Sequence, residues 1–118
     1  MTEQDFKERT KKLALATVRL VDALPRGRAV DGMARQLLKA GTSVGANYRA
    51  ACRAKSKADM PAKLGIVEEE ADETIYWLEL LVSAQMASEK DVRQMISEAN
   101  GILAMTVASI KTLRARNP

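Results

Sequence analysis

The chain has 118 residues, the size of one domain, so we expect a single domain over residues 1–118. Apolar residues make up 47% of it and aromatic residues only 3%, with three prolines and six glycines; this composition favours packed helices and disfavours a turn-rich β-protein. The net charge of +4 allows a polyanionic partner. The single cysteine excludes an internal disulfide, and the absence of histidine removes the commonest general base and metal ligand.

The first predicted helix covers about residues 3–23. Thr2 and Asp5 form a capping-box pattern at its start. Pro25 ends it, because the residue before a proline is disfavoured in the α region. The side chains expected to face inward recur at helical spacing: Phe6, Leu13, Thr17, Leu20, Val21 and Leu24.

The second predicted helix, about residues 29–54, separates charged from apolar side chains. Its cations lie on one side, with Thr42 and Ala46 between them: Arg35, Lys39, Arg49 and Arg53. Its opposite, apolar side carries Met33, Leu37, Val44, Tyr48 and Ala51. Gly41 and Gly45 each cost about 1 kcal/mol relative to alanine inside a helix, so we expect them to let another helix pack closely.

The third predicted helix, about residues 58–87, begins at a Ser56–Asp59 capping pattern and tolerates Pro61 in its first turn. Its core stripe is Leu64, Val67, Ala71, Ile75, Leu78 and Val82. A second apolar line, interrupted by two carboxylates, lies roughly opposite: Ile66, Glu70, Glu73, Trp77, Leu80 and Ala84. Because tryptophan is enriched at interface centres, this line predicts a homo-oligomer interface, the alternative being a few scattered exposed apolar side chains.

The fourth predicted helix, about residues 88–114, starts at a Ser88–Asp91 capping pattern. Its inward side chains are expected to be Val92, Met95, Ile96, Ala99, Leu103, Ile110 and Leu113. No segment alternates with a period of two residues. Short connections make neighbouring helices antiparallel, so the predicted fold is an all-α, up-down-up-down four-helix bundle.

No catalytic residue, cofactor site or metal site is expected. Carboxylates at i,i+3 spacing in the third helix are better explained by a solvated or salt-bridged face than by a bound cation. Cys52 is expected to be a small buried hydrophobe. For Asn47 and Tyr48 two interpretations stay open: direct ligand contact, or a structural role in which Asn47 hydrogen-bonds across to another helix or subunit.

Charge is segregated along the chain. Residues 1–57 carry thirteen Lys and Arg against five Asp and Glu, a balance of +8, whereas residues 58–98 carry three against ten, a balance of −7. This asymmetry predicts either pairing between segments or subunits, or a basic surface for a polyanion. Without a signal peptide or an apolar run of membrane-spanning length, the protein is expected to be cytoplasmic and to have no membrane partner.

Three segments carry a family resemblance: LLKAGTSVGANYRAACRAKS at 37–56, KLGI at 63–66 and EEADETIYWLELL at 69–81. They resemble the four-helix bundle proteins related to those encoded in intervening sequences of bacterial 23S ribosomal RNA genes. The resemblance implies an antiparallel bundle that assembles into a ring-like homopentamer. A relative with a similar fold, the accessory variability determinant of diversity-generating retroelements, binds nucleic acid and a reverse transcriptase.

Two functions follow as hypotheses. In the first, a non-catalytic homo-oligomer binds RNA or DNA without sequence preference through its basic stripe and the following lysines: Arg35, Lys39, Arg49, Arg53, Lys55 and Lys57. In the second, the protein is an adaptor that docks a partner enzyme such as a reverse transcriptase and does not itself bind nucleic acid.

Overall fold

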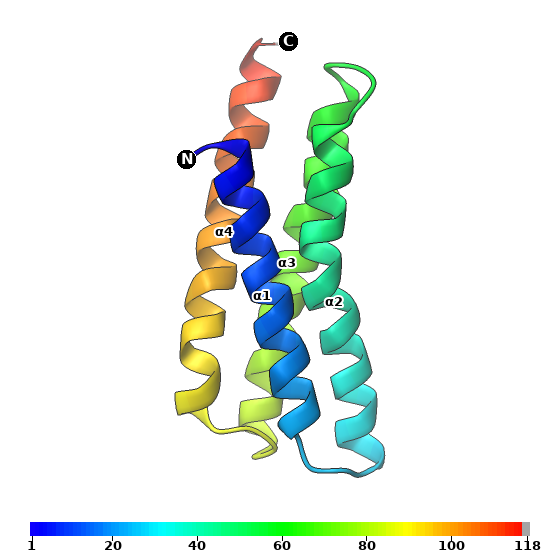
Figure 1. The fold of residues 1–118 in the computed structure, drawn as a ribbon, viewed down its shortest axis with the longest axis vertical. Helices are drawn as coiled ribbons and strands as arrows, with labels where there is room; N and C mark the ends of the chain where they lie inside the picture. Colours follow the sequence, from blue (N-terminus) through cyan, green and yellow to red (C-terminus); the bar gives the residue numbers. More distant parts are fainter. Residues whose placement is uncertain (117–118) are drawn as a thin grey trace.

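The computed structural model describes residues 1–116 and consists of four helices in an up-down-up-down bundle (Figure 1). The bundle is elongated, 48 Å long and 23 by 22 Å across. Consecutive helices pack side by side and α1 also packs on α4, whereas α1 and α3 lie diagonally opposite each other. The four helices are α1 (Glu3–Ala23), α2 (Arg28–Cys52), α3 (Asp59–Ser83) and α4 (Glu89–Arg116). The predicted fold is therefore confirmed.

The predicted start of α1 is also confirmed. The Thr2 hydroxyl accepts a hydrogen bond from the Asp5 amide at 3.0 Å, and the Asp5 carboxylate accepts one from the Thr2 amide at 3.1 Å. The Ser88 hydroxyl binds an amide in the first turn of α4, but the α3 helix departs from the predicted pattern, because its N-cap is Ala58, which forms no side-chain bond, and Ser56 lies in the turn before it. Ser56 accepts from the Asp59 amide at 3.1 Å, and Ser88 accepts from the Asp91 amide at 3.2 Å. These bonds satisfy amides that have no partner inside a helix.

The predicted end of α3 at about residue 87 is wrong by four residues. Gln85 has a left-handed backbone conformation, with φ of 62°. Its amide donates to the Val82 carbonyl at 2.9 Å, and the Met86 amide donates back to the Leu81 carbonyl at 2.9 Å. These two bonds form a Schellman motif, which closes a helix and usually has glycine in the left-handed position. Because glutamine takes that position here, the sequence did not signal the helix end.

Apolar side chains fill the bundle interior in two clusters. One is centred on Phe6, Val44, Val67 and Ile102, and the other joins Leu37 and Leu81 to their neighbours. The core also holds four buried threonines, of which only the first-helix Thr17 was expected to face inward. Each of these hydroxyls donates to a carbonyl of its own helix at 2.7–3.0 Å, so that all four are satisfied: Thr10, Thr17, Thr74 and Thr106.

Gly41 and Gly45 of α2 have the packing role that their spacing predicts. An alanine Cβ at Gly41 would lie 2.5 Å from Thr17 Oγ1, and one at Gly45 would lie 3.1 Å from Thr10 Oγ1. Both threonines belong to α1. Hydrogen in place of a side chain therefore lets α1 and α2 approach more closely than alanine allows.

Within residues 1–116, none of the helices combines the length with the apolar character that a membrane-spanning segment needs.

Candidate nucleic-acid interface

The predicted basic stripe forms an exposed line along the outer face of α2. All four of its cations are exposed, as are Thr42 and Ala46 between them: Arg35, Lys39, Arg49 and Arg53. The opposite face of the same helix is buried, with Leu37 and Val44 fully inaccessible to solvent. The 3.6-residue periodicity of α2 thus places every cation of the stripe in water and every large aliphatic side chain of the other face in the core.

None of the four stripe cations forms an ion pair with any residue that the structure describes. The ion pairs of the protein lie elsewhere, and the shortest joins Arg9 of α1 to Glu98 of α4 at 2.7 Å. Burial raises the pKa of Glu70 of α3, and at longer range the charge of Lys39 opposes that shift only in part. The stripe cations are consequently available to anions from solution.

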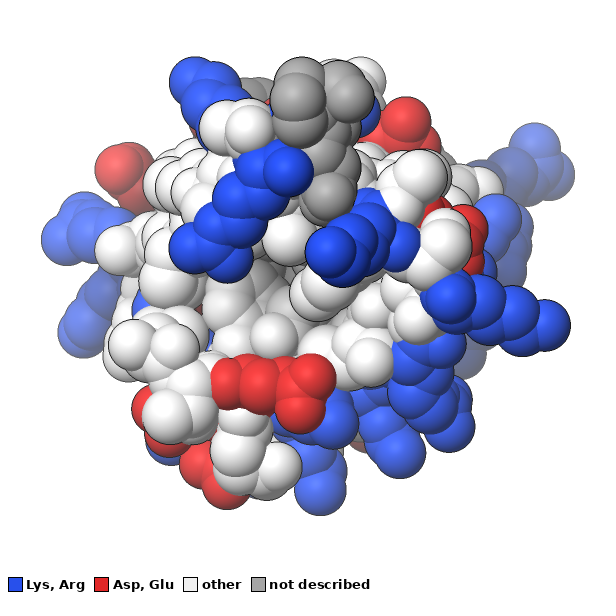
Figure 2. Space-filling model, turned by 90° about the horizontal axis from the view of Figure 1, so that it is seen from above, with Lys and Arg blue, Asp and Glu red and all other residues white. Residues whose placement is uncertain are grey.

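Lys55 and Lys57 extend the stripe beyond the end of α2. The helix was expected to reach residue 54, but it ends at Cys52, so both lysines lie in the α2–α3 connection and are exposed. Together with Arg116 they help to line a hollow of about 570 Å³ at this end of the bundle. Figure 2 looks onto that end and shows Lys and Arg side chains around most of its edge.

A groove between α1 and α2 brings further cations beside the stripe. It has a volume of about 610 Å³, and its lining includes Lys7 and Lys11 of α1 as well as Arg49 of α2. Sequence reasoning missed the two α1 lysines. The Gly41 and Gly45 spacing signals a tightly packed neighbour of α2, but nothing in the α1 sequence indicates which of its five cations would face that neighbour.

The predicted interface line on α3 is uneven in its exposure. Ile66 is 42% exposed and Ala84 is exposed, whereas Leu80 is half-buried. Trp77 is half-buried as well, because it packs against the core cluster of its own subunit. Its neighbour Tyr76, which was not predicted to belong to this line, is 55% exposed. The Tyr76 and Trp77 rings pack edge to face, with their centroids 5.0 Å apart. Oligomerisation through this face stays a prediction.

The two carboxylates of that line differ from each other. Glu73 is exposed, but Glu70 is half-buried and its Oε2 atom is inaccessible and has no hydrogen-bond partner. Burial raises the pKa of Glu70, and repulsion from the Glu73 carboxylate raises it further. Glu70 is therefore a poorly stabilised anion at neutral pH.

The predicted hydrogen bond from Asn47 to another helix is not observed. Its amide nitrogen donates instead to the Ser43 carbonyl of its own helix at 2.8 Å. A half-buried asparagine can thus satisfy its amide with a carbonyl one turn away on the same helix.

Tyr48 and Cys52 take structural positions between α1 and α2. The Tyr48 ring packs against Phe6 with centroids 4.3 Å apart. Burial raises the pKa of both the Tyr48 hydroxyl and the Cys52 thiol, and the two groups interact with each other. Cys52 was expected to be buried and is half-buried, and its raised pKa disfavours a reactive thiolate.

No group of three or more His, Cys, Asp or Glu side chains within residues 1–116 is arranged to hold a metal ion. Of the i,i+3 carboxylates of α3, Glu69, Asp72 and Glu73 are exposed and Glu70 is half-buried.

The fold defines the protein as a small antiparallel four-helix bundle, and comparisons with known proteins place it more closely. The chain belongs to the 23S rRNA-intervening sequence protein family, whose sequence profile matches residues 2–108. It is also similar to a crystal structure of a protein of unknown function from the S23 ribosomal protein family of Bacteroides thetaiotaomicron, with 32% identity and a TM-score of 0.83. That match covers 94% of this chain and 99% of the other. No curated protein matches the chain. Neither of the matching descriptions names a catalytic activity.

Proposed function

We propose that this protein is a cytoplasmic, non-catalytic homo-oligomer that binds nucleic acid through the basic stripe of α2 without reading its sequence. The observation that carries the proposal is that the four exposed cations of the stripe have no ion pair with any described residue. Cations left in water along one face of a helix are held apart from their own carboxylates and meet the regular negative charge of a phosphate backbone.

The aromatic side chains of the protein support backbone contact over base recognition. Phe6 is buried and Tyr48 half-buried, whereas Tyr76 and Trp77 belong to α3 and not to the stripe. Stacking of bases on aromatic rings is therefore unavailable to a strand lying on α2. Contacts to phosphates alone position a nucleic acid but carry no direct sequence information.

We further propose that the exposed face of α3 joins subunits into the homopentamer that the family resemblance implies. Ile66 and Tyr76 are exposed beside carboxylates on this face, a combination that suits contact with another protein surface. Five copies would raise the net charge from +4 to about +20 and repeat the basic stripe around a ring. This repetition would strengthen binding to a long polyanion through avidity.

The adaptor hypothesis is the second candidate, and the exposed Tyr76 favours it. A solvent-facing aromatic side chain on an acidic helix face is suited to the surface of a partner enzyme such as a reverse transcriptase. In that case the α3 face would carry the function and the α2 stripe would be dispensable.

The test is a fluorescence anisotropy titration with a labelled 20-nucleotide RNA and the matching DNA at 50 and 200 mM salt. Four phosphate contacts per subunit should weaken binding roughly 50- to 150-fold between these salt concentrations. A variant with all four stripe cations changed to glutamate should lose at least about a hundredfold in affinity at the lower salt. A wild-type protein that binds neither nucleic acid at 50 mM salt would overturn the proposal.

A matched control keeps net charge constant. Changing four exposed cations outside the stripe to glutamate gives the same net charge as the stripe variant: Lys12, Arg19, Lys90 and Lys111. The control should retain most of the affinity, because short-range contacts to phosphates dominate over a screened overall charge. Equal losses in both variants would show that net charge, and not the stripe, drives binding.

A further inference from the structure

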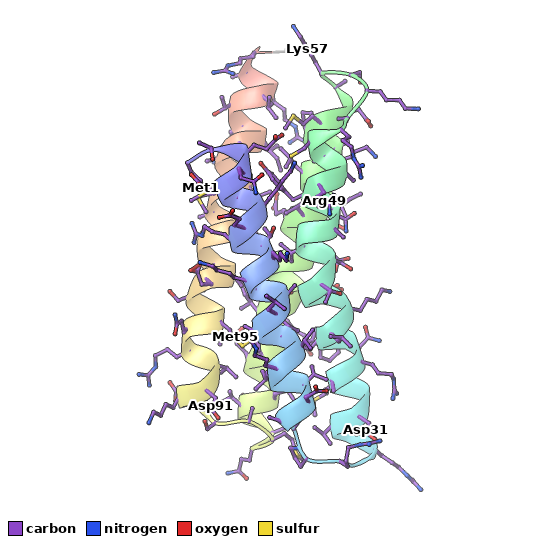
Figure 3. The ribbon with its side chains drawn as sticks, viewed as in Figure 1. Met1, Asp31, Arg49, Lys57, Asp91 and Met95 are labelled. Atoms are coloured by element: carbon purple, nitrogen blue, oxygen red, sulfur yellow. The ribbon has the colours of Figure 1, made fainter. Side chains whose placement is uncertain are left out.

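The groove between α1 and α2 exists because the two helices approach closely over small side chains. Its lining includes Gly45, which lies against Thr10, together with Ala14 and Ala46, and we call these three small residues the floor of the groove. The groove, of about 610 Å³, runs along the outer surface where α1 lies beside α2. Figure 3 shows Arg49 on the part of α2 that flanks the N-terminal half of α1.

Cations stand on both walls of this groove. Lys7 and Lys11 come from α1 and Arg49 from α2, against one carboxylate, that of Glu8. Lys7 contacts Glu3 at 3.8 Å in an exposed pair, which holds it weakly. Lys11 and Arg49 form no ion pair with any residue between positions 1 and 116. The groove therefore carries a formal excess of two positive charges.

The remaining polar groups of the groove add little hydrogen-bond specificity. The hydroxyls of Thr10 and Thr42 donate their protons to the Lys7 and Leu38 carbonyls at 3.0 and 2.7 Å. The Gln4 amide donates to Glu8 at 3.4 Å. The cations thus supply the free donors, and they attract an anion without selecting a particular pattern of donors and acceptors.

We propose that a nucleic acid strand lies along this groove, with its sugar–phosphate backbone on the alanine and glycine floor and its phosphates between the α1 lysines and Arg49. The inference rests on the proposed nucleic-acid binding and specifies where the strand runs. Arg49 belongs to both the stripe and the groove, so a strand seated between α1 and α2 also meets the cations of α2.

The chemistry of the lining favours a phosphate backbone over an acidic peptide. A docked peptide gains most of its affinity from apolar side chains in pockets, and the apolar side chains that line this groove are no larger than alanine. No aromatic side chain lines the groove, so bases would point away from it towards solvent.

The groove also leaves the α3 face free. The helices α1 and α3 do not pack on each other, and in Figure 1 α1 and α2 lie in front of α3. A strand between α1 and α2 and a subunit contact through the outer face of α3 would therefore occupy different sides of the bundle.

The experiment compares two double variants of α1 in the same anisotropy titration. Lys7→Gln with Lys11→Gln removes the groove cations and keeps much of their aliphatic length. Lys12→Gln with Arg19→Gln removes the same charge from exposed positions of α1 that do not line the groove. The groove variant should bind the RNA about tenfold or more weakly at 100 mM salt and lower the salt slope by about two, whereas the control should lose much less.

A third variant fills the groove without changing its charge. Ala46→Leu places a larger side chain at an exposed position of the floor in a residue type with good helix propensity. It should weaken binding by about threefold or more while circular dichroism and the salt slope stay unchanged, because it obstructs the strand and removes no phosphate contact.

The outcomes separate this inference from the proposed function. The proposal that a strand lies in the groove would be overturned if the groove variant and the control variant bound equally well, or if Ala46→Leu had no effect. Binding through the stripe would then still stand. Displacement of the RNA by polyglutamate as effectively as by unlabelled RNA of equal charge would also overturn the groove proposal. A wild-type protein that binds no nucleic acid would overturn both the groove proposal and the proposed function.

Discussion

The helices α2 and α3 have the same length, 25 residues each, and pack against each other, but their outer faces differ in chemistry. The outer face of α2 carries unpaired cations separated by small polar and alanine side chains. The outer face of α3 carries carboxylates, and between them lie exposed Ile66 and Tyr76. The outer face of α2 thus offers cations with one partly exposed apolar side chain, Leu38 at 36%, whereas that of α3 combines carboxylates with the more exposed Ile66 and Tyr76.

This difference separates two kinds of contact. Binding to phosphates works through charges that remain partly hydrated, so α2 needs no apolar surface to recognise a polyanion. A protein interface needs apolar side chains that lose water at its centre, and of these two outer faces that of α3 presents the more exposed ones. Substitutions on the outer faces of α2 and α3 should therefore affect different kinds of binding.

The largest expected effect concerns the α3 face. Ile66→Ala combined with Tyr76→Ala should weaken subunit association about 30-fold or more, because an aromatic side chain at an interface centre often contributes 2 kcal/mol or more. Light scattering should give about 65 kDa for a wild-type assembly of five 12.9 kDa chains and a smaller species for the variant. Tyr76 serves this test better than Trp77, which also packs on the core of its own subunit.

A control for that variant is available on α1. Leu15 and Val18 are 44% and 41% exposed, so Leu15→Ala with Val18→Ala removes similar apolar surface from another face. It should leave the molecular mass unchanged. A wild-type monomer at micromolar concentration would contradict the association, and an assembly insensitive to the α3 variant would place the interface elsewhere.

The second prediction concerns the packing of α2. Gly41→Ala should lower the free energy of unfolding by up to about 2 kcal/mol in urea titrations, since overpacking costs about 1–3 kcal/mol and the gain in helix propensity returns about 1. The new Cβ would lie 3.0 Å or less from three atoms of Thr17. Adding Thr17→Ala should relieve the clash, so the two substitutions should show a favourable coupling in a double-mutant cycle. Additive losses would contradict the close contact.

The same substitution in α3 should have the opposite sign. A Cβ at Gly65 would meet no atom within 4 Å, so Gly65→Ala should raise the free energy of unfolding by about 0.5–1 kcal/mol. The pair of variants holds the chemical change constant and varies only the surroundings. A loss of stability at Gly65 would show that this part of α3 is more crowded than the structure indicates.

The smallest expected effect depends on pH. The pKa of Glu70 is raised in the folded protein, so the folded state binds more protons than the unfolded state just above the ordinary glutamate pKa of about 4.3. The contribution of Glu70 to the free energy of unfolding is therefore lost as pH rises from the ordinary glutamate pKa through the raised pKa. Glu70→Gln should flatten that slope and increase stability at pH 7, whereas Glu79→Gln, at an exposed position, should do neither. An unchanged slope in Glu70→Gln would contradict the prediction.

The sequence alone was sufficient to predict the four helices, the sides of α1 and α2 that face inward, and the basic stripe. These features depend on side chains a few residues apart on one helix, so the periodicity and the capping residues determine them locally. Thr2 with Asp5, and the exposed line from Arg35 to Arg53, are where their spacing places them. The left-handed Gln85 escaped prediction because its conformation follows from the Schellman bonds and not from its residue type.

The tertiary structure decided which surfaces of different helices meet. Lys7 and Lys11 line a groove because Gly45 brings α1 close to α2, and Trp77 is half-buried because of the neighbours it finds in the core. Glu70 loses water on one oxygen for a similar reason. Each of these properties depends on the rotation and separation of one helix relative to another. Helix–helix packing sets those quantities across tens of residues of chain, where the periodicity of a single helix carries no information.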